Sequence, residues 1–387
     1  MTALCIAGGT VVGADGVASA DVLVVAGAIA AVGPSLSAPD GAVLVSADGL
    51  LVAPGSIDLQ LNGAHGIDLT EEPERLWEVA ALLPRYGVTG FLPTIVTSPP
   101  EVVDRAMVAL AARPAGFVGA EPLGLHLEGP MLNPDRRGAH PGSLLRQPEP
   151  SLVSGWSRQA GVALVTLAPE LPGAVPIIEQ LVGNGVVVSA GHTAASVSEL
   201  SAAVDAGVSY ITHLFNAMAP FSHRAPGPVG AALANERLAV GLISDGIHVH
   251  PTAVAVAWRA LGPDRLNLVS DAVAALGLPA GPSRLAGRDV TVGEGGVRLA
   301  DGTLAGSATA LDEAVRNLLA FTGCSVSEAL GTVTSTPARV LGLTRKGVVA
   351  PGFDADLVLL TRDLEVVATI VAGREVHRAE EVGPWRS

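Results

Sequence analysis

The sequence predicts an α/β protein: a (β/α)8 TIM-like barrel that carries a small β-sandwich domain built from both chain termini. The length of 387 residues allows one or two domains of ordinary size. In the middle of the chain, apolar strand-like runs alternate with helix-like segments, which is typical of a parallel sheet buried on both faces. Both ends of the chain consist of short strands and turns instead.

The terminal segments flank the rest of the chain. Residues 3–13, 21–33 and 42–54 are typical of short strands separated by Gly and Asp turns, and residues 347–361 and 365–376 have the same character. Because these two groups flank everything else, we expect one split domain of residues 1–53 and 345–387. The barrel then occupies residues 54–344.

Eight candidate strands fill the middle segment, most of them 20 to 35 residues apart. Eight βα units fit a closed barrel better than an open doubly wound sheet. The open sheet is the alternative, but no GxGxxG sequence follows the first strand to support it. The predicted strands are residues 56–63, 88–97, 123–129, 163–170, 186–192, 208–216, 239–248 and 266–272.

Charge and cysteine content exclude several classes of protein. The formal charge is −14, from 37 acids and 23 bases, and such a field repels nucleic acid, although a small phosphorylated ligand needs only local positive charge. Cys5 and Cys324 form no CxxC motif, so we expect no disulfide and a cytoplasmic location. The start of the chain has no signal-peptide pattern. Residues 22–39 lack charge, but their Gly, Pro and Ser residues favour turns over a membrane span.

Polar side chains recur at the carboxyl ends of the predicted strands. In a (β/α)8 barrel these ends form the active site, so the residues there are the candidates for chemistry. Glu128, His192, His213 and Asp271 are each separated by one or two βα units, and all four can point into one crater. The remaining polar residues at these ends are Asp58, Gln60, Asn62, Asn216, Asp245 and His248.

One Glu and two His residues are a known ligand set for a catalytic metal with one open position for water. Such a metal lowers the pKa of its water towards about 7. Asp271 is the candidate general base, and His248 could polarise a substrate carbonyl from the opposite side. Simpler interpretations exist: a solvated acid at Glu128, structural histidines, and a helix N-cap at Asp271. We interpret Asp58 as a structural or supporting carboxylate and His65 and His250 as surface or core histidines. His126 is not counted as a ligand, because we expect it to face away from Glu128 or to lie deeper in the barrel.

The sequence also resembles the N-acetylglucosamine-6-phosphate deacetylases, a family of the amidohydrolase superfamily. The motifs that carry the resemblance run along almost the whole chain. HLEGP followed by GAH, and THLFNAM, are the more specific ones, whereas residues 346–360 are shared by the wider superfamily. The motifs lie at residues 54–63, 126–140, 190–196, 212–218, 223–227, 243–251, 268–272, 302–318 and 335–343.

The resemblance implies a role for each of these site residues. Glu128, His192 and His213 would hold one divalent metal, with Zn²⁺ expected and Fe²⁺, Mn²⁺ or Co²⁺ as alternatives. Asp271 would act as base and then acid, and His248 would contact the carbonyl and the sugar. Arg224 would bind the phosphate in the neighbouring subunit of a homodimer. The sugar would be bound by His140, Asn216, Ala217, Leu304, Ala305, Gly306 and Ser307.

Two departures from related sequences affect these expectations. Many amidohydrolases carry His-x-His on the first strand, where this chain has Gln60 and Asn62, so we expect one tightly held metal and leave a weak second one open. Ala225 replaces a glutamate of the family beside Arg224, which leaves the exact substrate open. The expected reaction is hydrolysis of the acetamide of N-acetylglucosamine 6-phosphate. The alternatives are another N-acyl compound, such as N-acetylgalactosamine 6-phosphate or an N-acyl amino acid, and a non-catalytic sugar-phosphate sensor.

Overall fold

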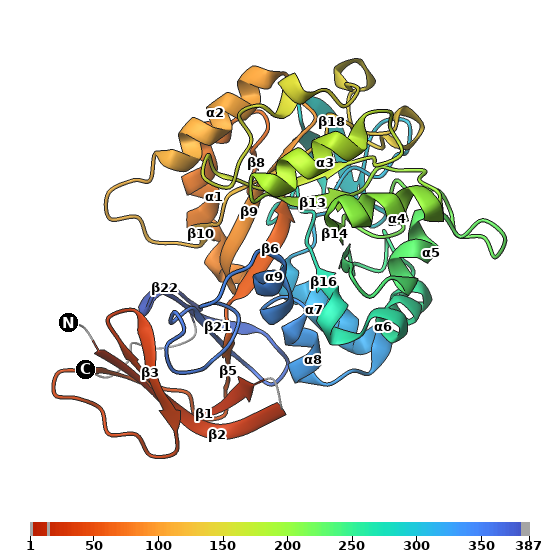
Figure 1. Cartoon of the computed structure of the whole chain (residues 1–387). Coiled ribbons are helices and arrows are strands. Elements are labelled where there is room, and N and C mark those ends of the chain that lie inside the picture. The colour runs from red at the N-terminus through yellow and green to blue at the C-terminus, as the bar shows by residue number, and fades with distance from the viewer. Residues whose placement is uncertain (1–2, 14–15, 381–387) are drawn as a thin grey trace.

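The computed structural model describes residues 3–13 and 16–380, and Figure 1 shows a sheet built from both ends of the chain below a larger barrel. The predicted fold class is confirmed. The exact boundaries of the split domain, after residue 53 and before residue 345, stay a prediction. Residues 1–2, 14–15 and 381–387 of that predicted domain lie outside the described part.

Strands from both termini pair in one sheet. Its strand order is β22-β21-β20-β5-β1-β2-β3, with β4 paired to β1, and β5 joins the two halves by running antiparallel to β20. Side chains from both halves share one apolar core, as expected for a sandwich. The strands are β1 (Ala3–Gly13), β2 (Gly16–Val25), β3 (Ala28–Gly33), β4 (Val43–Ser46), β5 (Leu51–Pro54), β20 (Leu357–Leu360), β21 (Val366–Val371) and β22 (Arg374–Arg378).

The eight barrel strands all overlap the runs predicted for them. Neighbouring strands pair in parallel from β6 through β9 to β16, and β6 approaches the end of β16 through the bond from Asn62 N–H to the Ala272 carbonyl, 2.7 Å. The carboxyl ends of all eight strands therefore meet at one rim. The strands are β6 (Ser56–Leu61), β9 (Val88–Val96), β11 (Leu125–Glu128), β12 (Val162–Leu167), β13 (Val187–Ala190), β14 (Val208–Ile211), β15 (Ala239–Leu242) and β16 (Leu266–Leu268).

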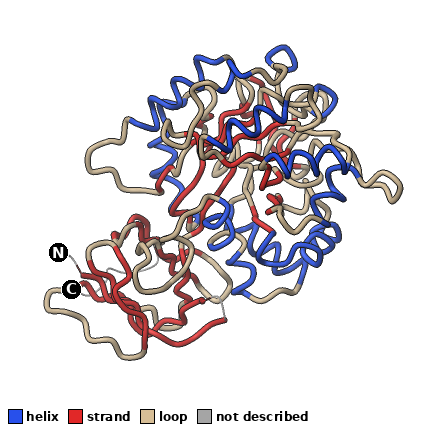
Figure 2. Tube along the Cα trace, in the orientation of Figure 1, coloured by secondary structure: helices blue, strands red, loops and turns tan. Residues whose placement is uncertain are grey.

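Helices surround this barrel in Figure 2. Capping boxes fix two of their N-termini: Ser196 with Glu199 starts α4, and Ser325 with Glu328 starts α8. Every helix of the described residues is too short or too polar to cross a membrane. The helices are α1 (Leu76–Leu82), α2 (Pro100–Ala111), α3 (Ala174–Gly183), α4 (Val197–Ala206), α5 (Gly227–Ala234), α6 (Pro251–Arg265), α7 (Leu311–Thr322), α8 (Val326–Gly331) and α9 (Ser335–Val340).

A three-stranded antiparallel sheet follows the barrel and was not predicted: β17 (Gly281–Leu285), β18 (Arg288–Gly293) and β19 (Gly296–Arg298). Ala286 and Gly287 connect its first two strands, both with positive φ (47° and 76°). Arg288 donates a hydrogen bond to the Ala139 carbonyl, 2.7 Å, and thereby ties this sheet to the loop after β11. Short elements complete the structure: β7 (Gly63–Ala64), β8 (Ile67–Asp68), β10 (Glu121–Pro122), η1 (Pro73–Arg75), η2 (Leu83–Tyr86), η3 (Pro134–Arg136), η4 (Gly142–Leu144) and η5 (Pro150–Val153).

Candidate active site

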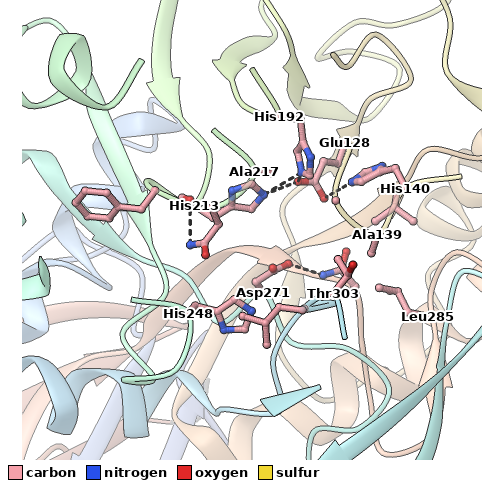
Figure 3. Close-up of a pocket in the computed structure, with 17 residues that line it drawn as sticks. Glu128, Ala139, His140, His192, His213, Ala217, His248, Asp271, Leu285 and Thr303 are labelled. Carbon is pink, nitrogen blue, oxygen red and sulfur yellow. Dashed lines mark hydrogen bonds and ion pairs between the residues drawn. The ribbon is translucent and has the colours of Figure 1, made fainter. Parts of the chain in front are cut away.

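A pocket of about 370 Å³ lies at the carboxyl ends of the barrel strands (Figure 3). It brings together most of the residues predicted from the strand ends and from the motifs. The lining residues are Asn62, Val96, Glu128, Gly138, Ala139, His140, His192, His213, Phe215, Asn216, Ala217, His248, Asp271, Leu285, Thr303, Leu304 and Gly306.

Three of these side chains converge as a metal-ligand set. Glu128 Oε1 lies 3.1 Å from His192 Nε2 and 3.0 Å from His213 Nε2, and the two Nε2 atoms are 3.1 Å apart. Ligands about 2.05 Å from a tetrahedral Zn²⁺ lie roughly 3.3 Å from one another, so the observed separations fit a single divalent ion. Both histidines follow their strands in the left-handed region, with φ of 49° and 30°, a backbone strain typical of functional sites.

Hydrogen bonding prepares His192 for this role. Its Nδ1 lies 2.9 Å from the Arg136 carbonyl, so Nδ1 carries the proton and Nε2 keeps a lone pair facing Glu128. Burial raises the pKa of Glu128, but the adjacent imidazoles of His192 and His213 outweigh this effect and hold that pKa well below its usual range. The set therefore offers a charged carboxylate beside two imidazoles, which a divalent cation would bind in their neutral form.

His140 is also close enough to count as a candidate ligand, because its Nε2 lies 3.7 Å from Glu128 Oε2. Burial first, and the neighbouring His192 second, lower the pKa of His140 to about 3, so the ring is neutral at pH 7. The Thr97 N–H donates to Nδ1 at 3.3 Å, and Thr97 Oγ1 lies 2.8 Å from the same nitrogen, so Thr97 orients the ring. Thr97 occupies Nδ1, so Nε2 is the ring nitrogen that faces Glu128 and the pocket, where it can contact a substrate.

Asp271 lies deep in the pocket and has the character of a general base. Burial first, and the negative charge of Glu128 second, raise the pKa of Asp271 to about 6. Asn62 Nδ2 donates to Asp271 Oδ1 at 2.8 Å, which leaves Oδ2 available to a proton. The alternative role as a helix N-cap is wrong, because residues 272–277 form turns and a bridge.

The two amides of the first strand both bond to carboxylates in the pocket. Gln60 Nε2 donates to Glu128 Oε1 at 3.2 Å, and Asn62 donates to Asp271 as described above. An amide nitrogen that faces a carboxylate is unsuited to bind a cation. The arrangement therefore favours one metal.

Several candidate residues lie outside the pocket lining. Ala305 and Ser307 are buried behind it, with Ser307 Oγ donating to the Ser270 carbonyl at 2.6 Å. His126 lies deeper in the barrel, as expected, where it contacts Leu59 and Thr166. Arg224 is exposed on the loop between β14 and α5, and no Lys or Arg of the described chain lines the pocket.

Other lining residues were missed at the sequence level. Leu285 and Thr303 come from the unpredicted sheet and the turn after it, and Val96, Gly138 and Phe215 lie beside predicted residues. The Ala286–Gly287 turn between alternating apolar and polar residues was the available signal for the sheet.

Comparisons with known proteins agree with this geometry. Residues 51–376 match the model of the amidohydrolase family. The mouse N-acetylglucosamine-6-phosphate deacetylase is 42% identical over 87% of this chain and 86% of its own length. The Bacillus subtilis enzyme of the same name is 40% identical over 87% of this chain and 86% of its own length.

Solved structures give the same result. The deacetylase of Pasteurella multocida superposes with a TM-score of 0.91 at 30% identity, covering 96% of this chain and 99% of its own. A mutant of the Mycobacterium smegmatis deacetylase, in complex with N-acetyl-D-glucosamine-6-phosphate, superposes with a TM-score of 0.88 at 34% identity. The match covers 97% of this chain and 100% of the mutant's chain. The chain therefore belongs to the amidohydrolase family, in the group that contains the N-acetylglucosamine-6-phosphate deacetylases.

Proposed function

We propose that this protein hydrolyses the acetamide of N-acetylglucosamine 6-phosphate to acetate and glucosamine 6-phosphate. The observation that carries this proposal is the convergence of Glu128, His192 and His213 beside a buried carboxylate of raised pKa, Asp271. The identity with deacetylases over most of the chain supports the substrate.

Each residue of the pocket has a separate task in this reaction. When bound, a divalent metal, which we propose to be Zn²⁺, polarises the acetamide carbonyl and acidifies a water molecule. Asp271 accepts the proton of the attacking water and returns it to the amine that leaves. His248 lies across the pocket from Glu128 and His192, where it can donate to the carbonyl oxygen (Figure 3). His140 Nε2 contacts the substrate, and Asn216, Ala217, Leu304 and Gly306 surround the sugar.

The phosphate needs positive charge that the described pocket lacks. Among the described residues none of the lining side chains is Lys or Arg, whereas the exposed Arg224 lies on a loop after β14. We infer a homodimer in which Arg224 reaches the site of the other subunit. A cytoplasmic location fits the two free cysteines.

Acetate release from metal-loaded protein tests this function. We expect turnover of N-acetylglucosamine 6-phosphate and at least a 1,000-fold loss in Asp271→Asn, of the order found when a triad member is removed from a hydrolase. The matched substrates are N-acetylgalactosamine 6-phosphate and unphosphorylated N-acetylglucosamine. No acetate from the first substrate, or full activity in Asp271→Asn, would overturn the proposal. Turnover of another N-acyl compound, without turnover of N-acetylglucosamine 6-phosphate, would overturn the proposed substrate and make that other compound the substrate.

A further inference from the structure

The loop after β15 holds a buried acid–histidine pair, Asp245 and His248. Asp245 Oδ2 lies 2.6 Å from His248 Nδ1, and the two side chains are only 3% and 4% exposed. Asp245 Oδ1 also accepts the N–H groups of Ile247 and His248, each at 2.8 Å. Gly246 adopts φ of 73°, which allows the backbone to make this tight turn. Three hydrogen bonds therefore hold the carboxylate against the ring.

These contacts decide what each ring nitrogen can do. A carboxylate only accepts hydrogen bonds, so His248 Nδ1 carries a proton. Nε2 is then the ring nitrogen left for a ligand in the pocket that His248 lines. A neutral ring of this tautomer presents a lone pair at Nε2, and only a doubly protonated ring presents an N–H there. A buried carboxylate at 2.6 Å stabilises the doubly protonated ring.

We propose that Asp245 is a positioning residue that keeps His248 as an N–H donor at Nε2, directed at the oxygen that becomes negative when the acetamide carbonyl is attacked. The role concerns that reaction and therefore rests on the proposed function. Asp245 does not line the pocket, so it acts through His248 alone. Without the carboxylate, the doubly protonated ring is less stable, and the neutral ring offers a lone pair to an oxygen that needs a donor.

Asp245→Asn tests the role, because it keeps the size of the side chain and removes its charge. We expect kcat to fall 10- to 100-fold with KM within about 3-fold, since the lost interaction is made mainly in the transition state. In a His248→Gln background, the same change should cost less than about 3-fold, because residues that act as one unit are not additive.

Asp356→Asn is the matched control. Asp356 is a buried carboxylate that accepts from Lys346 and from the Ala372 N–H at 2.8 Å, and it lies outside the pocket lining. It should lower the melting temperature and leave kcat unchanged. A fall of kcat in this control equal to that in Asp245→Asn would mean that both variants act through general destabilisation, and would overturn the role.

A more reactive substrate separates oxyanion stabilisation from a structural effect. The carbonyl of an N-trifluoroacetyl analogue is more electrophilic and depends less on the donor, so the loss in Asp245→Asn should shrink below about 3-fold. Equal losses on both substrates, or full additivity with His248→Gln, would overturn the role of Asp245.

A direct measurement keeps this inference separate from the proposed function. In ¹⁵N spectra of histidine-labelled protein recorded over a range of pH, we expect the doubly protonated form of His248 to persist to higher pH in the wild type than in Asp245→Asn. The same protonation in both proteins would overturn the role, whatever the substrate. Absence of acetate release by the wild type would instead overturn the proposed function.

Discussion

Replacing Asp58 with Asn should stabilise the fold, by an amount that increases with pH. Asp58 is fully buried on β6, where Oδ1 accepts from the Gln60 N–H at 3.1 Å and the Ser270 N–H at 3.3 Å. Oδ2 has no hydrogen-bond partner among the described residues. Burial, the largest effect, raises the pKa of Asp58 to about 7. Asn keeps the acceptor at Oδ1 and removes the buried charge.

The magnitude follows from proton linkage. Aspartate in an unfolded chain has a pKa of about 3.9, so between about pH 4 and pH 7 the folded wild type holds a proton that the unfolded chain releases. Wild-type stability therefore falls as pH rises through this window, by about 1.4 kcal/mol per pH unit. Between pH 5 and pH 8 the free energy of unfolding of the variant increases by about 3 kcal/mol relative to that of the wild type, and the whole increase occurs below about pH 7. At roughly 2.1 cal/mol/K per residue for unfolding, this gain corresponds to about 4 °C in Tm for a chain of 387 residues.

Thermal unfolding followed by circular dichroism at pH 5, 6, 7 and 8 measures this difference on metal-loaded proteins. Asp205→Asn is the control, because the Asp205 side chain is 70% exposed and its replacement should give no pH-dependent difference in Tm. A Tm difference between Asp58→Asn and the wild type that is the same at pH 5 and pH 8 would refute the reasoning. It would mean that Asp58 is not protonated in the folded state.

Three further predictions concern the pocket. The kcat/KM of the wild type should decline below about pH 6, because Asp271 must be deprotonated to act as a base. Asn62→Ala removes a hydrogen bond to the charged form of Asp271 and should move this decline to higher pH. A decline of kcat/KM only below pH 5 in both proteins would contradict the role of Asp271. His213→Ala should lose bound metal by elemental analysis, whereas His140→Ala should retain it and raise KM; equal metal loss in both would make His140 a ligand. Arg224→Ala should raise KM about 10- to 100-fold for the phosphorylated sugar only, as expected for a lost charge-assisted hydrogen bond, and an equal change for the unphosphorylated sugar would exclude phosphate recognition.

The barrel and the metal ligands could be predicted because both are set by local sequence. Buried parallel strands must be apolar throughout, so an acid or histidine that ends such a run stands out. Glu128, His192 and His213 were found in this way, and the structure brings their atoms within 3.1 Å of one another.

The rest depends on contacts that no local pattern encodes. The tautomer of His192 is set by the carbonyl of Arg136, 56 residues away in the chain. The sheet that supplies Leu285 is partly exposed and short, so its strands carry only a weak alternation of apolar and polar residues. Ala305 and Ser307 lie next to Leu304 and Gly306, which line the pocket. Successive residues of this segment point in alternate directions, so the side chains of Ala305 and Ser307 are buried away from the pocket.

The pairing of β5 with β20 has a consequence for synthesis of the chain. Leu51–Pro54 hydrogen-bonds to Leu357–Leu360, so the first strands emerge from the ribosome about 300 residues before their partner. At roughly 5 to 20 residues per second, the edge of β5 waits about 15 to 60 s, long enough for the barrel to form first. Until then the apolar strands at the N-terminus expose unpaired N–H and C=O groups, the kind of edge that recruits chaperones or aggregates. Nascent chains stalled before residue 357 should therefore be the aggregation-prone species, although their pocket-forming strands are already complete.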